Sequence, residues 1–139
     1  MKQKKEKFKT ILHDAGYRVT AERMATLLLL SRSKKPLSVH DIARVLRSVL
    51  DQATAYRILR LFERSGIVRR VEFGKGRVYY EIADAKDHHH IVCTECGAIE
   101  DFEGCTAERI EKEALKQSRR FSSVRKHSLE LFGVCKSCA

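Results

Sequence analysis

The chain is poor in several features, and each shortage excludes a class of protein. It has no tryptophan, one proline and 7% aromatic residues, while 43% of its 139 residues are hydrophobic. This composition is typical of a helix-rich globular protein and excludes a disordered one. The longest apolar run, Ala25 to Leu30, covers about six residues and contains a threonine, whereas a membrane-spanning helix needs roughly 20. The sequence therefore does not predict a membrane protein.

The amino terminus and the cysteines indicate a reducing compartment. The segment MKQKKEKFKT is basic but has no apolar core and no small-residue cleavage site after it, so we expect a cytoplasmic protein without a secretory signal. Disulfides are rare in that compartment. Four of the five cysteines form two Cys-x-x-Cys pairs, which is metal-ligand spacing, and Cys105 stands alone. The paired cysteines are Cys93, Cys96, Cys135 and Cys138.

The positive charge lies in one part of the chain. Residues 1–82 hold 19 Lys and Arg against 8 Asp and Glu, a net charge of +11, and residues 83–139 hold 9 against 10, a net charge of −1. The first region is basic, and the second, which holds the metal ligands, is near neutral. This difference indicates that the first region binds an acidic polymer and the second binds a cation. The alternative is a basic surface that serves solubility alone.

The first half carries the signals of four helices. The first has an apolar i, i+3, i+4, i+7 pattern that ends before Gly16. N-cap residues open the other three: Thr20, Ser38 in a capping box with Asp41, and Asp51. In the third helix we expect the inward side chains to be Ile42, Val45 and Leu46. The third and fourth helices, separated by a short turn, resemble a helix-turn-helix.

The fourth helix combines a buried stripe with a face suited to DNA. The stripe consists of Ala55, Ile58, Leu59 and Phe62. The outward positions are Gln52, Thr54, Tyr56, Arg57, Arg60 and Arg64. Amide, hydroxyl and guanidinium groups read base edges or hold phosphates, and a tyrosine ring packs on a thymine methyl. The alternative for any one of these residues is simple solvation of the helix.

After the fourth helix the pattern changes to alternation. IVRRVEF and RVYYEI, on either side of Gly74-Lys75-Gly76, predict a β-hairpin. Helices followed by a basic hairpin describe a winged helix, in which one helix enters the major groove and the wing lies against the backbone. We therefore predict an α+β protein with a winged helix-turn-helix domain in residues 1–82, a hinge at 83–87 and a metal-binding domain in 88–139.

The two cysteine pairs predict a zinc site in the second domain. Each pair presents two thiolates from a tight turn to one tetrahedral ion. The interval between the pairs has room for a strand in AIEDF, a helix over 106–117 and a strand in HSLELFGV. A redox dithiol or a disulfide is the alternative, but neither requires two matched pairs. Four thiolates fill the coordination shell, so this zinc is predicted to be structural.

The histidines are predicted to serve two further metal sites. In an extended segment His88 and His90 point to one face and His89 to the other. One site is assembled from His88 and His90 with Glu81 and Asp101, and the other from His89 with Glu108 and His127, with Asp87 as a further candidate. Such ligand sets suit Zn, Fe(II), Mn, Co or Ni. The alternative is that these are ordinary surface or core histidines.

Taken together, these segments make the chain resemble the ferric uptake regulator superfamily of bacterial metal-sensing repressors. The segments that carry the resemblance are GYRVTAER, ATAYRILRLFERSGIV, HHHIVCTECGAIEDF, HSLELFGVC and the final CKSC. The resemblance implies a homodimer with N-terminal winged helices and a C-terminal dimerisation domain, which represses transcription from palindromic, AT-rich operators in double-stranded DNA when a regulatory metal is bound. We do not expect an enzyme, because nothing supplies a nucleophile and its base.

The resemblance also implies residue roles. Tyr56 and Arg57 match the recognition-helix pair, and Arg18 matches the basic residue that approaches an AT-rich minor groove. The four paired cysteines match the structural zinc site. Glu81, His88, His90 and Asp101 match the regulatory site between the domains, and His89, Glu108 and His127 match an additional site in the dimerisation domain.

The departures from the family pattern concern the regulatory metal. Pro36 occupies the position where iron and peroxide sensors usually carry a histidine, with His40 four residues on, and Asp87 replaces the first residue of the usual histidine run. The hinge also lacks the cysteine that zinc sensors often use. We expect Zn or Fe(II) as the regulatory metal ahead of Mn or Ni. A constitutive, zinc-stabilised DNA-binding protein and a peroxide sensor are the alternatives.

Overall fold

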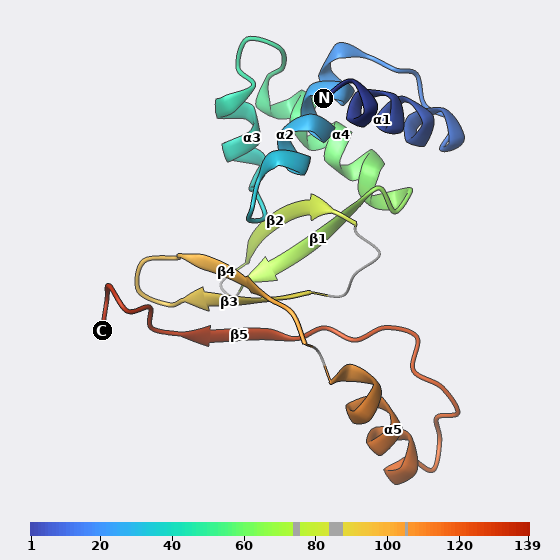
Figure 1. Cartoon of the computed structure of the whole chain (residues 1–139), viewed down its shortest axis with the longest axis vertical. Coiled ribbons are helices and arrows are strands. Elements are labelled where there is room, and N and C mark those ends of the chain that lie inside the picture. The colour runs from blue at the N-terminus through green and yellow to red at the C-terminus, as the bar shows by residue number, and fades with distance from the viewer. Residues whose placement is uncertain (74–75, 84–87, 105) are drawn as a thin grey trace. The chain divides into compact units, whose positions relative to one another are not determined.

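The chain forms two compact units, Met1–Asp84 and Ala85–Ala139, in a computed structural model (Figure 1). The structure describes residues 1–73, 76–83, 88–104 and 106–139, and each unit is described by itself. Most of the predicted hinge, including Asp87, lies outside these residues, as do Cys105 and two residues of the predicted hairpin turn. No helix among the described residues has the length and apolar character that a membrane span requires.

The first unit follows the local signals of its sequence. Its elements are α1 (Lys2–Asp14), α2 (Ala21–Arg32), α3 (Val39–Val45), α4 (Gln52–Arg64), β1 (Val68–Phe73) and β2 (Arg77–Ile82). The predicted N-caps are confirmed. Thr20 accepts the backbone N–H of Arg23 at 3.3 Å, and Asp51 accepts that of Thr54 at 2.7 Å. Ser38 caps α3 in a reciprocal capping box. Side chains that satisfy the first free N–H groups therefore fix where α2, α3 and α4 begin.

The core of the first unit lies between the helices and the hairpin. The predicted stripe of α4 is confirmed as buried, and it packs with residues of α1, α2 and α3. The prediction for Val45 is wrong, because this side chain is 53% exposed. Ile42 is fully buried and Leu46, one turn later, packs against the core. Ile42 and Leu46, four residues apart, form the narrow stripe of this short helix that packs on the core. Val45 lies outside this stripe and faces solvent.

The predicted hairpin is confirmed. β1 and β2 pair antiparallel, with Val68 opposite Ile82 and Phe73 opposite Arg77. Leu37, in the loop between α2 and α3, adds a bridge that the sequence did not reveal, since it exchanges backbone hydrogen bonds of 2.9 and 2.7 Å with Tyr80. This bridge attaches the loop that enters α3 to the wing, which completes the winged-helix arrangement.

The second unit is a three-stranded sheet with one helix in its described residues. Its elements are β3 (His89–Cys93), β4 (Ile99–Phe102), α5 (Ala107–Gln117) and β5 (Glu130–Gly133), with strand order β4-β3-β5. β3 is antiparallel to β4 and parallel to β5. The predicted strand over 127–134 is shorter than expected, because β3 begins at His89 and pairing with β5 starts at Glu130. The parallel pairing brings the carboxyl ends of β3 and β5 to the same edge.

Candidate metal centres and nucleic-acid interface

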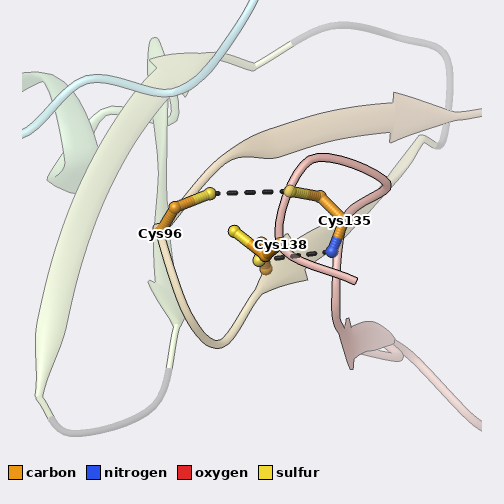
Figure 2. Close-up of side chains that lie close together, drawn as sticks. Cys96, Cys135 and Cys138 are labelled. Atoms are coloured by element: carbon orange, nitrogen blue, oxygen red, sulfur yellow. Dashed lines mark hydrogen bonds between the residues drawn. The ribbon is translucent and has the colours of Figure 1, made fainter.

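The four paired cysteines gather at the edge where β3 and β5 end. Cys93 is opposite Gly133 in the register, so the turn that holds Cys96 and the turn that holds Cys135 and Cys138 lie next to each other. All four sulfurs lie within 4.8 Å of one another. Figure 2 shows Cys96 facing Cys135, with 3.7 Å between their sulfurs. Four thiol sulfurs from two adjacent turns are the donor set of a tetrahedral zinc site.

The cysteines of this cluster differ in proton affinity. Backbone N–H groups of Cys96 and Cys135 hydrogen-bond to the Cys93 sulfur and lower the pKa of Cys93 to about 6. The N–H of Cys135 approaches this sulfur to 3.3 Å. Hydrogen bonds with the thiols of Cys135 and Cys96 raise the pKa of Cys138 to about 12. Because thiolates this close repel one another, a cation must offset their charge before all four lose their protons.

A histidine lies between two carboxylates on one face of the sheet. His90 is opposite Asp101 on β4 and opposite Glu130 on β5. Its Nε2 is 3.4 Å from an oxygen of Asp101, and its Nδ1 is 3.3 Å from an oxygen of Glu130. The ring of His88 lies edge-on to that of His90, with 5.2 Å between centroids. The structure therefore brings together three of the four predicted regulatory ligands, together with one carboxylate that was not predicted.

The fourth predicted ligand, Glu81, belongs to the first unit. It lies on β2, where its carboxylate accepts a hydrogen bond of 2.9 Å from Nε of Arg69 on β1. The histidines belong to the second unit, so the regulatory site that would join these residues stays a prediction. Pro36 is fully buried within the first unit, and a proline side chain carries no atom that could take the place of the missing histidine as a ligand.

His89 points to the other face of the sheet, as the alternation of a strand predicts. Its ring lies 5.4 Å from that of His127 and 5.5 Å from that of Phe102, measured between centroids. The Nε2 atom of His89 is buried without a hydrogen-bond partner among the described residues. Such a nitrogen is suited to a metal ion, because an unpaired buried polar atom is costly. The donor chemistry of this pair therefore fits the predicted additional site.

The carboxylate beside this histidine pair differs from the predicted one. Glu111, one helical turn after Glu108 on α5, places Oε1 at 3.0 Å from Nδ1 of His127. Glu108 is exposed to solvent. The i, i+3 spacing of the two glutamates puts both near one face of α5. The predicted role of Glu108 stays untested, and Glu111 is a candidate that sequence reasoning missed.

The outward face of α4 offers polar groups to a ligand. Gln52 and Arg57 are exposed and Thr54 is half-buried. Tyr56 is 49% exposed, and its hydroxyl accepts a hydrogen bond of 3.3 Å from Arg60, whose guanidinium lies 5.8 Å from the ring centroid. These contacts restrict the tyrosine rotamer before any ligand binds. The predicted Arg18 is also exposed, in the segment that precedes α2.

Comparisons with known proteins place this geometry in a family. The model of the ferric uptake regulator family matches residues 14–132. The chain belongs to the ferric uptake regulator family. The ferric uptake regulation protein of Neisseria meningitidis serogroup A is 33% identical over 139 residues, which span 96% of this chain and 95% of that relative. That of Bacillus subtilis is 31% identical and covers 99% of this chain and 96% of its own length. Members of the ferric uptake regulator family are metal-responsive transcriptional regulators, and this function extends to the chain.

Solved structures of the ferric uptake regulator family share the fold. The Helicobacter pylori ferric uptake regulator matches with a TM-score of 0.81 and 26% identity, over 99% of this chain and 92% of that one. The Vibrio cholerae ferric uptake regulator matches with a TM-score of 0.79 and 30% identity, over 91% of this chain and 98% of that one. The predicted fold class, α+β with an N-terminal winged helix and a cysteine cluster in the second unit, is confirmed.

Proposed function

We propose that the chain is a metal-dependent repressor that binds double-stranded DNA as a homodimer and controls metal-homeostasis genes in the cytoplasm. The observation that carries this proposal is the position of His90, between carboxylates of two neighbouring strands in a member of the ferric uptake regulator family. Imidazole and carboxylate groups together suit Fe(II) or Zn, which we favour, and also Mn or Ni.

We assign DNA binding to the first unit. The net charge of +11 on residues 1–82 favours contact with phosphates, and the exposed face of α4 carries side chains that read base edges. In this proposal Gln52, Thr54, Tyr56 and Arg57 enter the major groove, and Arg18 approaches the minor groove of an AT-rich, palindromic operator. The hydrogen bond from Arg60 to Tyr56 supports this reading, because a restricted side chain loses less entropy on binding.

We assign three metal sites to the chain. Two take all their ligands from the second unit, and the third also takes Glu81 from the first. Cys93, Cys96, Cys135 and Cys138 hold a structural zinc. Glu81, His88, His90 and Asp101 hold the regulatory metal. The additional site comprises His89 and His127 with Glu108, and Glu111 is a further carboxylate beside it. The Helicobacter pylori relative, which has three functional metal binding sites, supports this division.

Metal response requires that the ion favours one conformation over another. Glu81 from the first unit and His88, His90 and Asp101 from the second hold one ion jointly in this proposal, which fixes the separation of the two recognition helices in the dimer. A ligand shifts an equilibrium only by its differential affinity for the two states. A preference of about 100-fold for the DNA-binding conformation corresponds to about 2.7 kcal/mol.

We assign dimerisation to the second unit. It exposes large apolar side chains, among them Ile110 on α5 at 59% and Phe132 on β5 at 52%. In this proposal these side chains are covered by the second protomer, since exposed apolar side chains that form one patch mark an interface with a protein partner. The symmetry of a homodimer would match a palindromic operator, since each winged helix would read one half-site.

Operator binding titrated with single metals tests this function. The zinc-loaded protein is titrated into a fluorescent operator with Zn, Fe(II) under anaerobic conditions, Mn or Ni, and the metal content of the purified protein is measured in parallel. We expect Fe(II) or Zn to raise the affinity by about 100-fold. Binding that is indifferent to every metal and to chelator would support the alternative, a constitutive DNA-binding protein with structural zinc.

A further inference from the structure

Glu130 shares a row of the second unit's sheet with two predicted metal ligands. The register sets Asp101 on β4 opposite His90 on β3, and His90 opposite Glu130 on β5. Residues directly opposite each other in paired strands project to the same face. The three side chains therefore form a line of carboxylate, imidazole and carboxylate across the sheet. Of these three, Glu130 has no place in the ligand set that the family resemblance implies.

The two ring nitrogens of His90 face different carboxylates. Nε2 lies 3.4 Å from Oδ1 of Asp101, and Nδ1 lies 3.3 Å from Oε2 of Glu130. The Asp101 side chain is 41% exposed and the Glu130 side chain is 20% exposed. A metal that takes Asp101 and His90 as ligands therefore binds the imidazole through Nε2. Glu130 lies at the opposite edge of the ring.

The environment of Glu130 requires a compensating group. Its Oε2 atom is buried and accepts no hydrogen bond from the described residues. Removing a carboxylate oxygen from water without a donor is costly. The Nδ1 atom of His90 is 3.3 Å away, so an N–H at this position would supply the donor after a small rotation of either side chain.

This arrangement has a consequence for the chemistry of His90. A neutral imidazole that coordinates through Nε2 carries its proton on Nδ1. A carboxylate that accepts this proton in a hydrogen bond fixes the tautomer and the ring orientation, and it makes Nε2 a stronger donor to the metal. Loss of such a partner typically costs about 10- to 100-fold in metal affinity.

We propose that Glu130 is a positioning residue of the regulatory site, which holds His90 as the Nδ1–H tautomer and so presents Nε2 to the metal. The proposal rests on the proposed function, in that it takes His90 as a ligand of the regulatory metal. It adds a residue that neither coordinates the ion nor contacts DNA but sets the affinity of the site.

Full-length, zinc-loaded protein titrated with Co(II) tests the proposal. The Co(II) binding that disappears in His90→Ala defines the regulatory site. We expect Glu130→Gln to lower the Co(II) affinity of this site by about 10- to 100-fold and Glu130→Asp, which keeps the charge, to recover part of the loss. The matched control is Glu100→Gln on β4, which removes an exposed carboxylate opposite Ile91 in the same sheet. This control should stay within about 2-fold of wild type.

A second readout separates positioning from general damage to the fold. In the Co(II)-loaded protein, proton NMR should show a strongly shifted, solvent-exchangeable Nδ1–H resonance that is absent in His90→Ala. We expect its exchange with water to accelerate in Glu130→Gln and to be unchanged in Glu100→Gln. The visible absorption bands of bound Co(II) should keep their pattern in Glu130→Gln, because the ligand set is the same.

Three results would overturn the proposal. Wild-type affinity and an unchanged Nδ1–H resonance in Glu130→Gln, with binding still lost in His90→Ala, would reject the role of Glu130 alone and leave the proposed function intact. A change in Co(II) coordination number in Glu130→Gln would make Glu130 a direct ligand. Co(II) binding that His90→Ala does not alter would reject the regulatory site itself, and the positioning role with it.

Discussion

Cys93 and Cys138 belong to one cluster and yet differ widely in acidity. The pKa of Cys93 is lowered to about 6 by backbone N–H donors, whereas that of Cys138 is raised to about 12 by its thiol neighbours. Cys93 therefore loses its proton more readily than Cys138. A metal that binds all four sulfurs must displace the remaining protons, so binding of zinc couples the protonation of the cluster to the folding of the second unit.

Removal of one thiol tests the structural zinc at the scale of a single residue. We expect Cys96→Ser to lose the zinc and to destabilise the second unit, because the two turns after β3 and β5 are held together by this cluster. Zinc content and sedimentation measure the loss of metal and of the dimer. Cys105→Ser, which removes the thiol outside the two pairs, is the matched control and should keep both. A Cys96→Ser dimer with full zinc content would contradict the assignment.

At the scale of the element, α4 depends on its N-cap. Hydrogen bonds from the side chain and then the backbone of Thr54 lower the pKa of Asp51 in the folded chain. A carboxyl whose folded pKa lies below its unfolded value of about 3.9 stabilises the fold at higher pH, and this contribution disappears as pH falls through the folded pKa. Asp51→Asn keeps a cap that does not titrate.

The stability advantage of wild type over Asp51→Asn should therefore shrink between pH 7 and pH 3. Urea unfolding followed by tyrosine fluorescence measures it, since all four tyrosines lie between residues 17 and 80 and report on the first unit. An advantage of the same size at both pH values would mean that the charge of this carboxylate does not contribute to the cap.

The exposed face of α4 makes a second prediction at this scale. Arg57→Ala should weaken operator binding and, if the guanidinium contacts a phosphate, reduce the slope of log affinity against log salt by about 1. Arg109→Ala on α5 removes the same charge from the near-neutral unit and is the control. Fluorescence anisotropy at several salt concentrations measures both variants. Equal losses in the two would mean that net charge, and not α4, determines the affinity.

The elements differ in how well their local sequence predicts their bounds and contacts. Thr20, Ser38 and Asp51 act on N–H groups three residues away, so the starts of α2, α3 and α4 were predictable from local sequence. The length of β5 and the position of Glu130 depend on the register with β3, which no local pattern encodes. Glu111 was missed for the same reason, because its contact with His127 depends on how a distant segment packs on α5.

At the scale of the whole molecule, charge and metal ligands occupy different units. The first unit carries the net positive charge and the exposed face of α4. The second carries the cysteine cluster and His90, which lies between Asp101 and Glu130. Membership in the ferric uptake regulator family joins these properties in one regulator. The central claim is that a metal held by His90 controls the affinity of α4 for DNA.

Operator binding by His90→Ala, with and without the regulatory metal, tests this claim most directly. The variant and wild type, both zinc-loaded, are titrated into the same fluorescent operator, and sedimentation checks that each is a dimer. We predict that the metal strengthens wild-type binding by about 100-fold. His90→Ala should stay a folded dimer and bind the operator with the weak, metal-independent affinity of metal-free wild type. A His90→Ala protein that still responds fully to the metal would contradict the account.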